Sequence, residues 1–336
     1  MINKYIIFIL LSATFLASCQ PTDKNNDTKD TGLFNFDIDK KNMTVSGISA
    51  GGYMATQFHV AYSSQISGVG ILAGGPYWCA RGEITRALGY CMKGGGGTDP
   101  KLINEYIEQS RKNKKIDNTS NLKTDKVWIF HGAKDMIMAN SISRAIKDFY
   151  AQFTESRNIQ EVYDVAANHG MPTLSTGVQC DTIGGSFLNA CNYDAAGEML
   201  KTFYGEVNKR TEATGSLIKI DQSPYKEAHL TNEGYLYVPN NCQDNQTCQL
   251  HTVFHGCMQS TEFIGEDFIK GAGYNEWAES NNIVIFYPQV KSSQFAPMNP
   301  KGCWDWWGYT NENYANNKGP QMMAIHDLIK TIAGIE

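Results

Sequence analysis

The sequence has little excess charge, few metal-ligand patterns and no apolar run long enough for a membrane helix. Of its 336 residues 19% are charged, and the formal net charge is −5 with a pI near 5.8. This balance argues against nucleic acid or an anionic membrane surface as the main partner. No C-x-x-C pair, closely spaced His/Cys quartet or phosphate-loop motif occurs, so neither a metal nor a cofactor is expected. What remains is the composition of a globular enzyme with a substantial core.

The N-terminal residues predict export. Lys4 precedes an apolar run from Tyr5 to Leu11 and then small residues, which is the pattern of a signal peptide over residues 1–18. The run is shorter than the about 20 apolar residues that a spanning helix needs. A polar stretch over residues 19–35 is typical of a flexible tether, which leaves residues 36–336 as a single folded domain.

Leu16-Ala17-Ser18-Cys19 resembles a bacterial lipobox, in which Cys19 would be lipidated. Gln20 after the cysteine resembles the pattern of outer-membrane sorting. We therefore expect an outer-membrane or cell-surface lipoprotein, with simple signal cleavage and a periplasmic or secreted protein as the alternative.

The cysteines predict a disulfide framework. Nine are present, and setting Cys19 aside leaves an even number in an exported chain. Eight cysteines allow 105 pairings, so proximity in sequence is only a guide. It suggests Cys79–Cys91, Cys180–Cys191, Cys242–Cys248 and Cys257–Cys303.

The segment Gly47-Ile48-Ser49-Ala50-Gly51 fits the pattern G-x-S-x-G. A β-type run precedes it and a helix-compatible run, residues 53–62, follows it. Strand, sharp turn and helix are the setting in which a serine becomes the nucleophile of an α/β-hydrolase. The N–H of Ala50, at the start of the helix, would stabilise an oxyanion.

An acid and a histidine follow in the order that such a nucleophile requires. Asp135 lies just after a predicted strand at 126–131, in H-G-x-x-D, where it would orient an imidazole. A turn or helix-capping role is its alternative. His169 lies on a Gly/Pro-rich loop after a predicted strand at 161–165. Loops at strand ends carry catalytic groups in such sheets, and the order Ser, Asp, His favours a triad.

A second donor is predicted far along the chain. Leu250 to Phe254 reads as a strand that runs into His255-Gly256-Cys257. A His-Gly loop of this type supplies the second oxyanion N–H of a hydrolase, here that of Cys257. His251 and His255 lie in or beside a strand with no third ligand in view, so structural roles are favoured over a metal.

Three tryptophans crowd one loop, at Trp304, Trp306 and Trp307. Core packing and a substrate-binding face are both open interpretations of such a loop.

The predicted fold is an α/β-hydrolase with a mostly parallel sheet and helices on both faces. In the usual order, however, the oxyanion His-Gly loop precedes the nucleophile. Here it follows the histidine, which is the signature of a circular permutation.

Taken together, these motifs resemble those of extracellular poly(3-hydroxybutyrate) depolymerases, and the chain order is similar to that of their single-domain, fungal-type members. The resemblance covers about residues 36–336. The segments that carry it are G-I-S-A-G-G-Y-M-A (47–55), I-L-A-G-G-P-Y (71–77), H-G-x-x-D (131–135), H-G-M-P-T (169–173), F-H-G-C-M-Q (254–259), I-F-Y-P-Q (285–289) and G-C-W-D-W (302–306).

The resemblance implies that Ser49, Asp135 and His169 form the triad and that the three tryptophans line a polymer-binding crevice. Many bacterial members add a linker and a polymer-binding domain, and neither is visible in this sequence. An esterase for feruloyl or acetyl groups on plant polysaccharide shares the same site chemistry and is the nearest alternative. A non-catalytic surface lipoprotein that binds a partner through its tryptophans is the alternative from another class. The oligomeric state cannot be read from the sequence.

Overall fold

The computed structural model describes residues 36–94, 99–243 and 246–335. The predicted signal peptide, Cys19 and the tether up to residue 35 lie outside the described residues. Within the described ranges, no helix is both long and apolar enough to cross a membrane.

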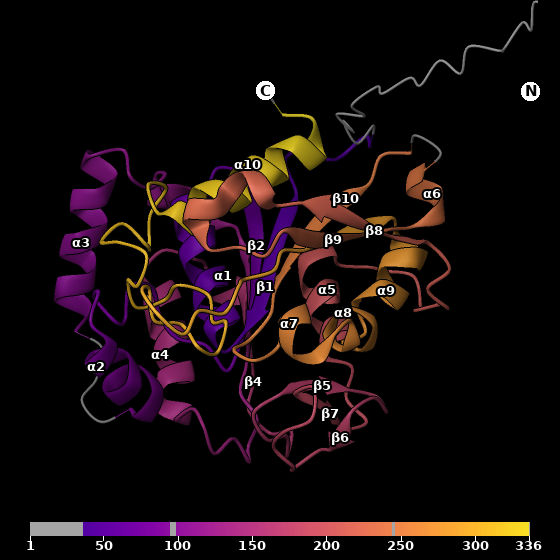
Figure 1. Ribbon diagram of the computed structural model, residues 1–336, viewed down its shortest axis with the longest axis horizontal. Coiled ribbons are helices and arrows are strands. Elements are labelled where there is room, and N and C mark those ends of the chain that lie inside the picture. Colours follow the sequence, from indigo (N-terminus) through magenta and orange to yellow (C-terminus); the bar gives the residue numbers. More distant parts are fainter. Residues whose placement is uncertain (1–35, 95–98, 244–245, 336) are drawn as a thin grey trace, which may run out of the picture. The chain divides into compact units, whose positions relative to one another are not determined.

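An eight-stranded sheet forms the centre of the domain (Figure 1). In spatial order its strands are β4 (Ile159–Val162), β3 (Lys126–Phe130), β2 (Ile66–Leu72), β1 (Met43–Ile48), β10 (Gln249–Phe254), β11 (Ile283–Tyr287), β9 (Glu233–Val238) and β8 (Ser216–Asp221). Adjacent strands pair in parallel from β4 to β11, whereas β9 is antiparallel to both of its neighbours. The sheet is therefore mostly parallel, as the sequence predicts.

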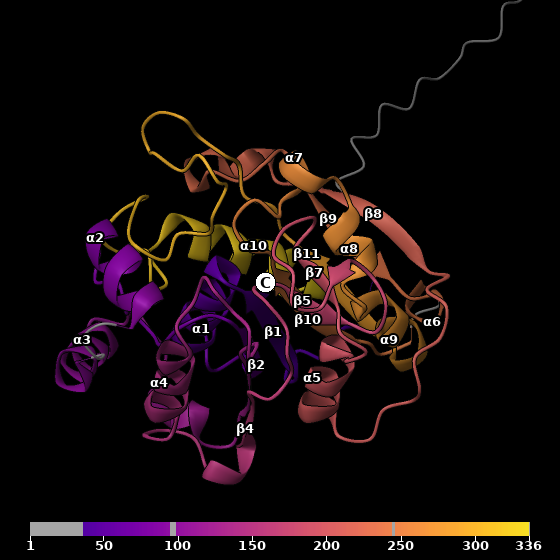
Figure 2. The same ribbon diagram turned by 90° about the horizontal axis from the view of Figure 1, so that it is seen from below.

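Helices cover both faces of the sheet, and Figures 1 and 2 show α1 and α4 on one side and α5, α8 and α9 on the other. The helices are α1 (Ala50–Ala61), α2 (Ile84–Arg86), α3 (Pro100–Lys112), α4 (Asn140–Tyr150), α5 (Ala195–Tyr204), α6 (Asn240–Gln243), α7 (Thr261–Ile264), α8 (Asp267–Gly271), α9 (Tyr274–Asn281) and α10 (Pro320–Ala333). Short 3-10 helices span Thr119–Lys123, Ser156–Asn158 and Ser223–Ala228, and a π-helical turn spans Ala87–Cys91.

The core lies in two layers, one on each face of the sheet. Successive side chains of a strand point to opposite faces, and β3 shows the result. Val127 and Ile129 pack in the layer that contains α1, α4 and α10. Trp128 and Phe130 pack in the layer that contains α5 and α9. Strands buried on both faces explain the continuous apolar runs in the sequence.

A second, three-stranded sheet lies in the segment between β4 and α5. Its order is β5 (Met171–Thr173), β7 (Leu188–Ala190) and β6 (Val178–Gln179), all parallel. The Cys180–Cys191 disulfide closes this segment. The sequence predicts only a stapled loop here, so the small sheet is an addition. It matters because His169 lies two residues before the start of β5.

Candidate active site

Ser49 occupies the turn between β1 and α1. Its backbone has φ 57° and ψ −119°, a left-handed conformation that is unusual for a residue with a side chain. The flanking glycines make the turn possible. A Cβ on Gly47 would lie 2.2 Å from the Gly51 carbonyl oxygen, and one on Gly51 would lie 2.1 Å from the Phe254 carbonyl oxygen. The close packing of β1, α1 and β10 therefore requires glycine on both sides of Ser49.

Asp135 and His169 form a hydrogen-bonded pair. The Asp135 Oδ2 atom lies 2.8 Å from Nδ1 of His169, and the Asp135 side chain is fully buried. The N–H groups of Ile137 and Met138 donate to Asp135 Oδ1 at 2.8 and 2.9 Å. Burial opposes ionisation, but the bonds from His169 and from these N–H groups outweigh it and hold the pKa of Asp135 below its usual range. The ring Nε2 of His169 is thereby left to accept a proton.

Hydrogen bonds bring the loops that carry these residues to one edge of the sheet. Ser49 N–H, just after β1, donates to the Leu72 carbonyl at the end of β2, and Ala73 N–H donates to the Phe130 carbonyl at the end of β3. His131 N–H then donates to the Val162 carbonyl at the end of β4. Among the described residues no hydrogen bond joins Ser49 Oγ to His169, and such catalytic bonds are commonly long without substrate.

The loop after β10 lies against Ser49. A Cβ on Gly256 would come within 3.6 Å of the Ser49 Cβ. In the described part of the chain the N–H groups of Ala50 and Cys257 donate to no protein acceptor, as expected for the first turn of a helix in the case of Ala50. The Cys257–Cys303 disulfide anchors this loop. Two unpaired N–H groups are thus available beside the serine.

Both histidines near this loop are buried and structural. His251 is held between Thr44 Oγ1 at 2.7 Å and Ser46 Oγ at 2.8 Å. The Val290 N–H donates to Nε2 of His255 at 3.2 Å, so the other ring nitrogen, Nδ1, donates to the Gly256 carbonyl at 2.7 Å. His255 therefore braces the turn that presents Cys257. Among the described residues no group of His, Cys, Asp and Glu could hold a metal ion.

The tryptophans correct the expectation that all three line a binding face. Trp304 is fully buried and packs edge-on against Phe254 with ring centroids 5.0 Å apart. Trp306 is 6% exposed and stacks on Tyr53 at 4.4 Å. Both side chains therefore pack in the hydrophobic core on the α1 side of the sheet. Trp307 alone is half-buried, and it packs edge-on against Trp306.

The disulfides join the four pairs that proximity in sequence suggests: Cys79–Cys91, Cys180–Cys191, Cys242–Cys248 and Cys257–Cys303.

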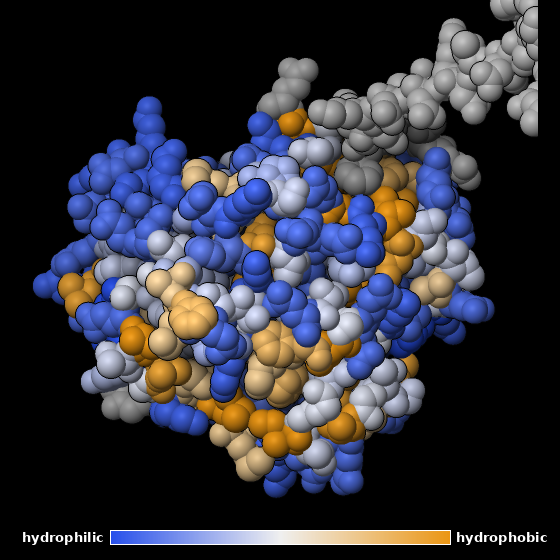
Figure 3. All heavy atoms as spheres, in the orientation of Figure 1, coloured by the Kyte–Doolittle hydropathy of each residue, from blue (hydrophilic) through white to orange (hydrophobic). Residues whose placement is uncertain are grey.

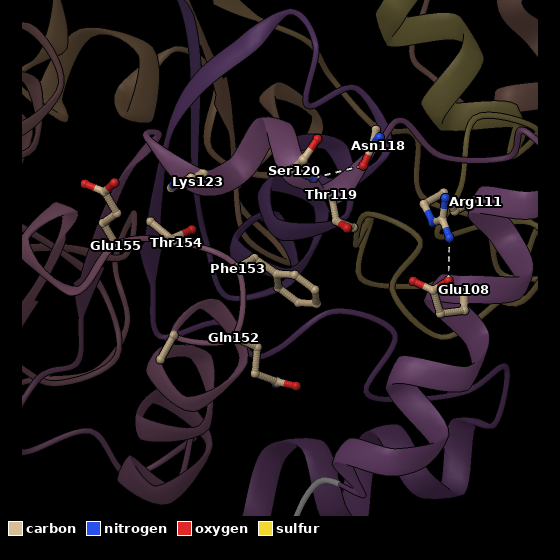
Figure 4. A pocket seen from close by; sticks show the side chains of 11 residues that line it. Glu108, Arg111, Asn118, Thr119, Ser120, Lys123, Gln152, Phe153, Thr154 and Glu155 are labelled. Carbon is tan, nitrogen blue, oxygen red and sulfur yellow. Dashed lines mark hydrogen bonds and ion pairs between the residues drawn. The ribbon is translucent and has the colours of Figure 1, made fainter.

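An open hollow of about 560 Å³ lies away from Ser49, between α3 and the end of α4 (Figure 4). Its lining is mostly polar and includes the hydrogen-bonded pair Arg111 and Glu108. None of its lining residues belongs to the loops around Ser49, so it is not part of the candidate site.

Two buried residues that bond to the loops of the site were not singled out from the sequence. Asn168 is buried, and its Oδ1 accepts the N–H of His169 at 2.8 Å and that of Met136 at 3.4 Å. It thus ties the His169 loop to the Asp135 loop. Gln259 accepts the Gly256 N–H at 2.7 Å. Asn168 and Gln259 each lie within three residues of a predicted site residue, and this closeness in sequence is the feature by which they could have been found.

A mostly parallel sheet with a strained serine turn at one strand end, and a carboxylate–imidazole pair at the same edge, defines an α/β-hydrolase. Comparison with known proteins is more specific. The chain belongs to the family of poly(3-hydroxybutyrate) depolymerases. No family model matches it, so the assignment rests on individual relatives and solved structures.

Two relatives cover most of this chain. It is 38% identical over 303 residues to the poly(3-hydroxybutyrate) depolymerase of Delftia acidovorans, a match that covers 88% of this chain and 60% of that enzyme. It is 36% identical over 319 residues to the polyhydroxybutyrate depolymerase of Talaromyces funiculosus, covering 90% of this chain and 92% of the relative. The chain therefore spans less than two thirds of the Delftia enzyme but nearly all of the fungal one.

Solved structures support the same family assignment. The crystal structure of a PHB depolymerase from Penicillium funiculosum superposes with a TM-score of 0.84 at 35% identity, over 90% of this chain and 99% of that one. A serine-to-alanine variant of a PHB depolymerase in complex with an R3HB trimer gives a TM-score of 0.85, also at 35% identity, with the same coverage. The likeness therefore covers nearly the whole of each solved chain.

Proposed function

We propose that this protein is a serine esterase that hydrolyses poly(3-hydroxybutyrate) or its oligomers. The observation that carries the proposal is the Asp135–His169 pair at the sheet edge where the strained Ser49 turn and two unpaired N–H groups lie. The relatives' names support the polyester as substrate class. The depolymerase structure with an R3HB trimer supports oligomers as ligands of that relative.

Acylation would use each member of the site. Ser49 Oγ attacks the ester carbonyl carbon while Nε2 of His169 accepts its proton. Asp135 holds the imidazole through Nδ1 and stabilises the imidazolium that forms. The oxyanion accepts hydrogen bonds from the N–H groups of Ala50 and Cys257. When the tetrahedral intermediate collapses, the ester C–O bond breaks, and the leaving alkoxide oxygen takes the proton from His169 and departs as a hydroxyl group.

Deacylation repeats these steps with water. His169 removes a proton from a water molecule, whose oxygen attacks the acyl carbon bound to Ser49 Oγ. The intermediate collapses with return of the proton to Ser49, which releases a carboxylic acid and restores the enzyme. Of the three tryptophans, the half-buried Trp307 is the one that we retain as a substrate contact.

We propose that residues 36–336 form one catalytic domain and that the protein acts outside the cytoplasm. Four disulfides support export, because such bonds persist in oxidising compartments. Lipidation at Cys19 stays a prediction from the lipobox pattern. Labelling with a radioactive fatty acid, present in the intact chain and lost in Cys19→Ser, would test it.

We also propose that the chain is a circular permutation of the usual hydrolase order. The contact of Lys40 Nζ with the Gly334 carbonyl, at 2.9 Å, supports this by placing the end of α10 beside the start of β1. The pairing of β1 with β10 supports it too, since strands far apart in sequence are neighbours in the sheet.

Substitution of the serine tests the activity. Ser49→Ala should lower turnover of a soluble short-chain ester on the order of 10⁶-fold, the loss expected when a triad nucleophile is removed. An organophosphonate should label the intact protein and not the variant. Retained turnover in the variant would contradict the mechanism, and absence of labelling in the intact protein would favour a non-catalytic binding protein.

Substrate profiling tests the ester class. Clearing of a poly(3-hydroxybutyrate) suspension is expected, with no comparable release of ferulate or acetate from xylan. The reverse result would identify a carbohydrate esterase with the same triad chemistry.

A further inference from the structure

Gln259 carries a buried side-chain amide beside the catalytic loops. The proposed mechanism gives this side chain no role. It is 2% exposed, and each end of its side chain is hydrogen-bonded. Its Oε1 accepts the Gly256 N–H at 2.7 Å, and its Nε2 donates to the carbonyls of Ser186 and Phe187 at 3.1 and 3.3 Å. One side chain thus links the loop after β10 to the segment before β7.

The Phe187 carbonyl also belongs to the support of His169. It accepts the N–H of Met171 at 2.8 Å, and Met171 is two residues beyond His169. The contact is close, because a Cβ on Gly170 would lie 2.9 Å from the same carbonyl oxygen. Phe187 itself has a left-handed backbone, with φ 54°. The Phe187 carbonyl therefore accepts hydrogen bonds from both the His169 loop and Gln259, and it does so from a strained backbone.

On the other side, Gln259 reaches the residue that touches the serine turn. Gly256 packs against Ser49 and precedes Cys257, whose N–H is one of the two proposed oxyanion donors. The peptide between Gly256 and Cys257 is also held by His255, which donates to the Gly256 carbonyl at 2.7 Å. Gln259 thus holds the peptide before Gly256 through its N–H, and His255 holds the following peptide, which carries the Cys257 N–H, through its carbonyl.

We propose that Gln259 is a positioning residue that sets the oxyanion loop relative to the His169 loop. The proposal rests on the proposed serine-esterase function. Its amide is suited to the task because it accepts from one loop and donates to the other, which no hydrocarbon of the same size can do. Small displacements at such a site cost large factors in rate: a misplacement of about 1 Å can cost about 10²-fold.

A matched control lies in the same protein. Gln222 is 1% exposed, donates to the carbonyls of Thr231 and Gln289, and accepts the N–H of Gln289. It makes the same kinds of bond as Gln259, but neither partner is in the serine, oxyanion or histidine loop. Gln222→Leu and Gln259→Leu should therefore lose similar stability through unpaired backbone groups, while only the second should lose catalytic power.

The experiment is steady-state kinetics on a soluble short-chain ester, with active sites counted by organophosphonate titration and stability followed by thermal unfolding. Gln259→Leu should lower kcat per active site by about 10- to 100-fold with KM changed less than about twofold. Gln222→Leu should keep kcat within about twofold. Equal kcat losses in the two variants, or an unchanged kcat in Gln259→Leu, would overturn the proposal. An inactive parent protein would instead overturn the function.

Gln259→Glu provides a second test that does not depend on the leucine variant folding. A protonated glutamate can accept from Gly256 and donate to Phe187, as the amide does, whereas a carboxylate faces two carbonyl oxygens. The ratio of kcat in Gln259→Glu to that in the parent should fall as the pH rises through the pKa of the new carboxyl. A ratio that is constant with pH would contradict a positioning role for the Nε2 donor.

Discussion

The backbone of Ser49 shows what the fold must supply at the scale of one residue. A left-handed conformation of this kind costs of order 1–3 kcal/mol and persists only where its surroundings over-determine it. Here Ser49 N–H donates to Leu72 and its carbonyl accepts from Tyr53, at 2.9 and 3.1 Å. The glycines on both sides remove the atoms that would push the turn open. Ser49 is half-buried, and a sharp strand-to-helix turn of this kind is the setting that exposes the Oγ of a nucleophilic serine.

A prediction at the residue scale concerns His251 and acid stability. Burial lowers the pKa of His251 to about 3, whereas an unfolded histidine titrates near about 6.5. The unfolded state therefore binds more protons between these values, and the stability present above about pH 6.5 is lost as the pH falls toward 3. Each pH unit costs at most about 1.4 kcal/mol.

Urea unfolding at pH 7.5 and pH 5.0 measures this loss. His251→Gln lacks the titrating ring, so its stability should fall less between the two pH values than that of the parent. An equal fall in both proteins would show that burial of His251 does not contribute to the acid sensitivity.

The candidate triad could be predicted because each member lies in a short local pattern. Ser49, Asp135 and His169 each follow a strand, and strand ends of a parallel sheet meet at one edge. Gln259 could not be assigned a role, because its second partner, Phe187, lies 72 residues away in the chain. For Trp304 and Trp306 the sequence leaves core packing and a binding face both open. Local density of aromatics cannot distinguish a core from a binding face, since only the packing of Phe254 and Tyr53 decides it.

At the scale of elements, the hairpin over residues 293–299 stands out on the surface. Ser293 and Asn299 exchange two backbone hydrogen bonds of 2.9 Å, while Phe295 is 83% exposed and Met298 is 70% exposed. Its base is tied to the site, because Asn299 accepts the N–H of Cys303, which is disulfide-bonded to Cys257. Figure 3 shows further apolar residues at the surface in the lower part of the view.

This hairpin should adsorb the enzyme to solid polyester. Full burial of a Phe or Met side chain contributes about 1.5–3 kcal/mol, so Phe295→Ser with Met298→Ser should weaken binding to a polymer film by at least about tenfold. Turnover of a soluble ester should not change. Depletion of protein from solution by film measures the binding. Leu88→Ser, which removes an exposed apolar residue on the π-helical turn, is the control, and equal binding by both variants would contradict the prediction.

The main elements of the fold follow from hydrophobic periodicity, whereas the small ones do not. The apolar run at 283–287 is β11 and the amphipathic segment at 321–332 lies within α10. Strands β5, β6 and β7 have only two or three residues each, too few to show an alternation. Their pairing depends on the Cys180–Cys191 bridge and on tight contacts at Gly170 and Gly177. These constraints act between distant residues, so no local pattern reveals them.

At the scale of the whole molecule, the beginning and the end of the described residues lie side by side. Lys40, just before β1, bonds to the end of α10, and the strands from the second half of the chain continue the sheet from β1 outward. We therefore expect that the two halves can be joined in the other covalent order without a change of fold. Each disulfide joins two cysteines on the same side of residues 205–206, so opening the chain there separates no pair.

A rearranged chain should fold to the same structure. It would join Ile335 to Phe36 by about six Gly and Ser residues, enough for a gap of up to roughly 20 Å, and begin at Glu206, which is exposed and follows the end of α5. The His-Gly loop would then precede Ser49, followed by Asp135 and His169, in the usual hydrolase order. The melting temperature and the kcat on a soluble ester should stay close to those of the parent, because no contact in the sheet changes.

A chain with the same linker but opened between Trp128 and Ile129, inside β3, should not fold, since its break lies in a buried strand. Equal failure of both rearranged chains would contradict the adjacency of the two ends and the permutation inferred from it.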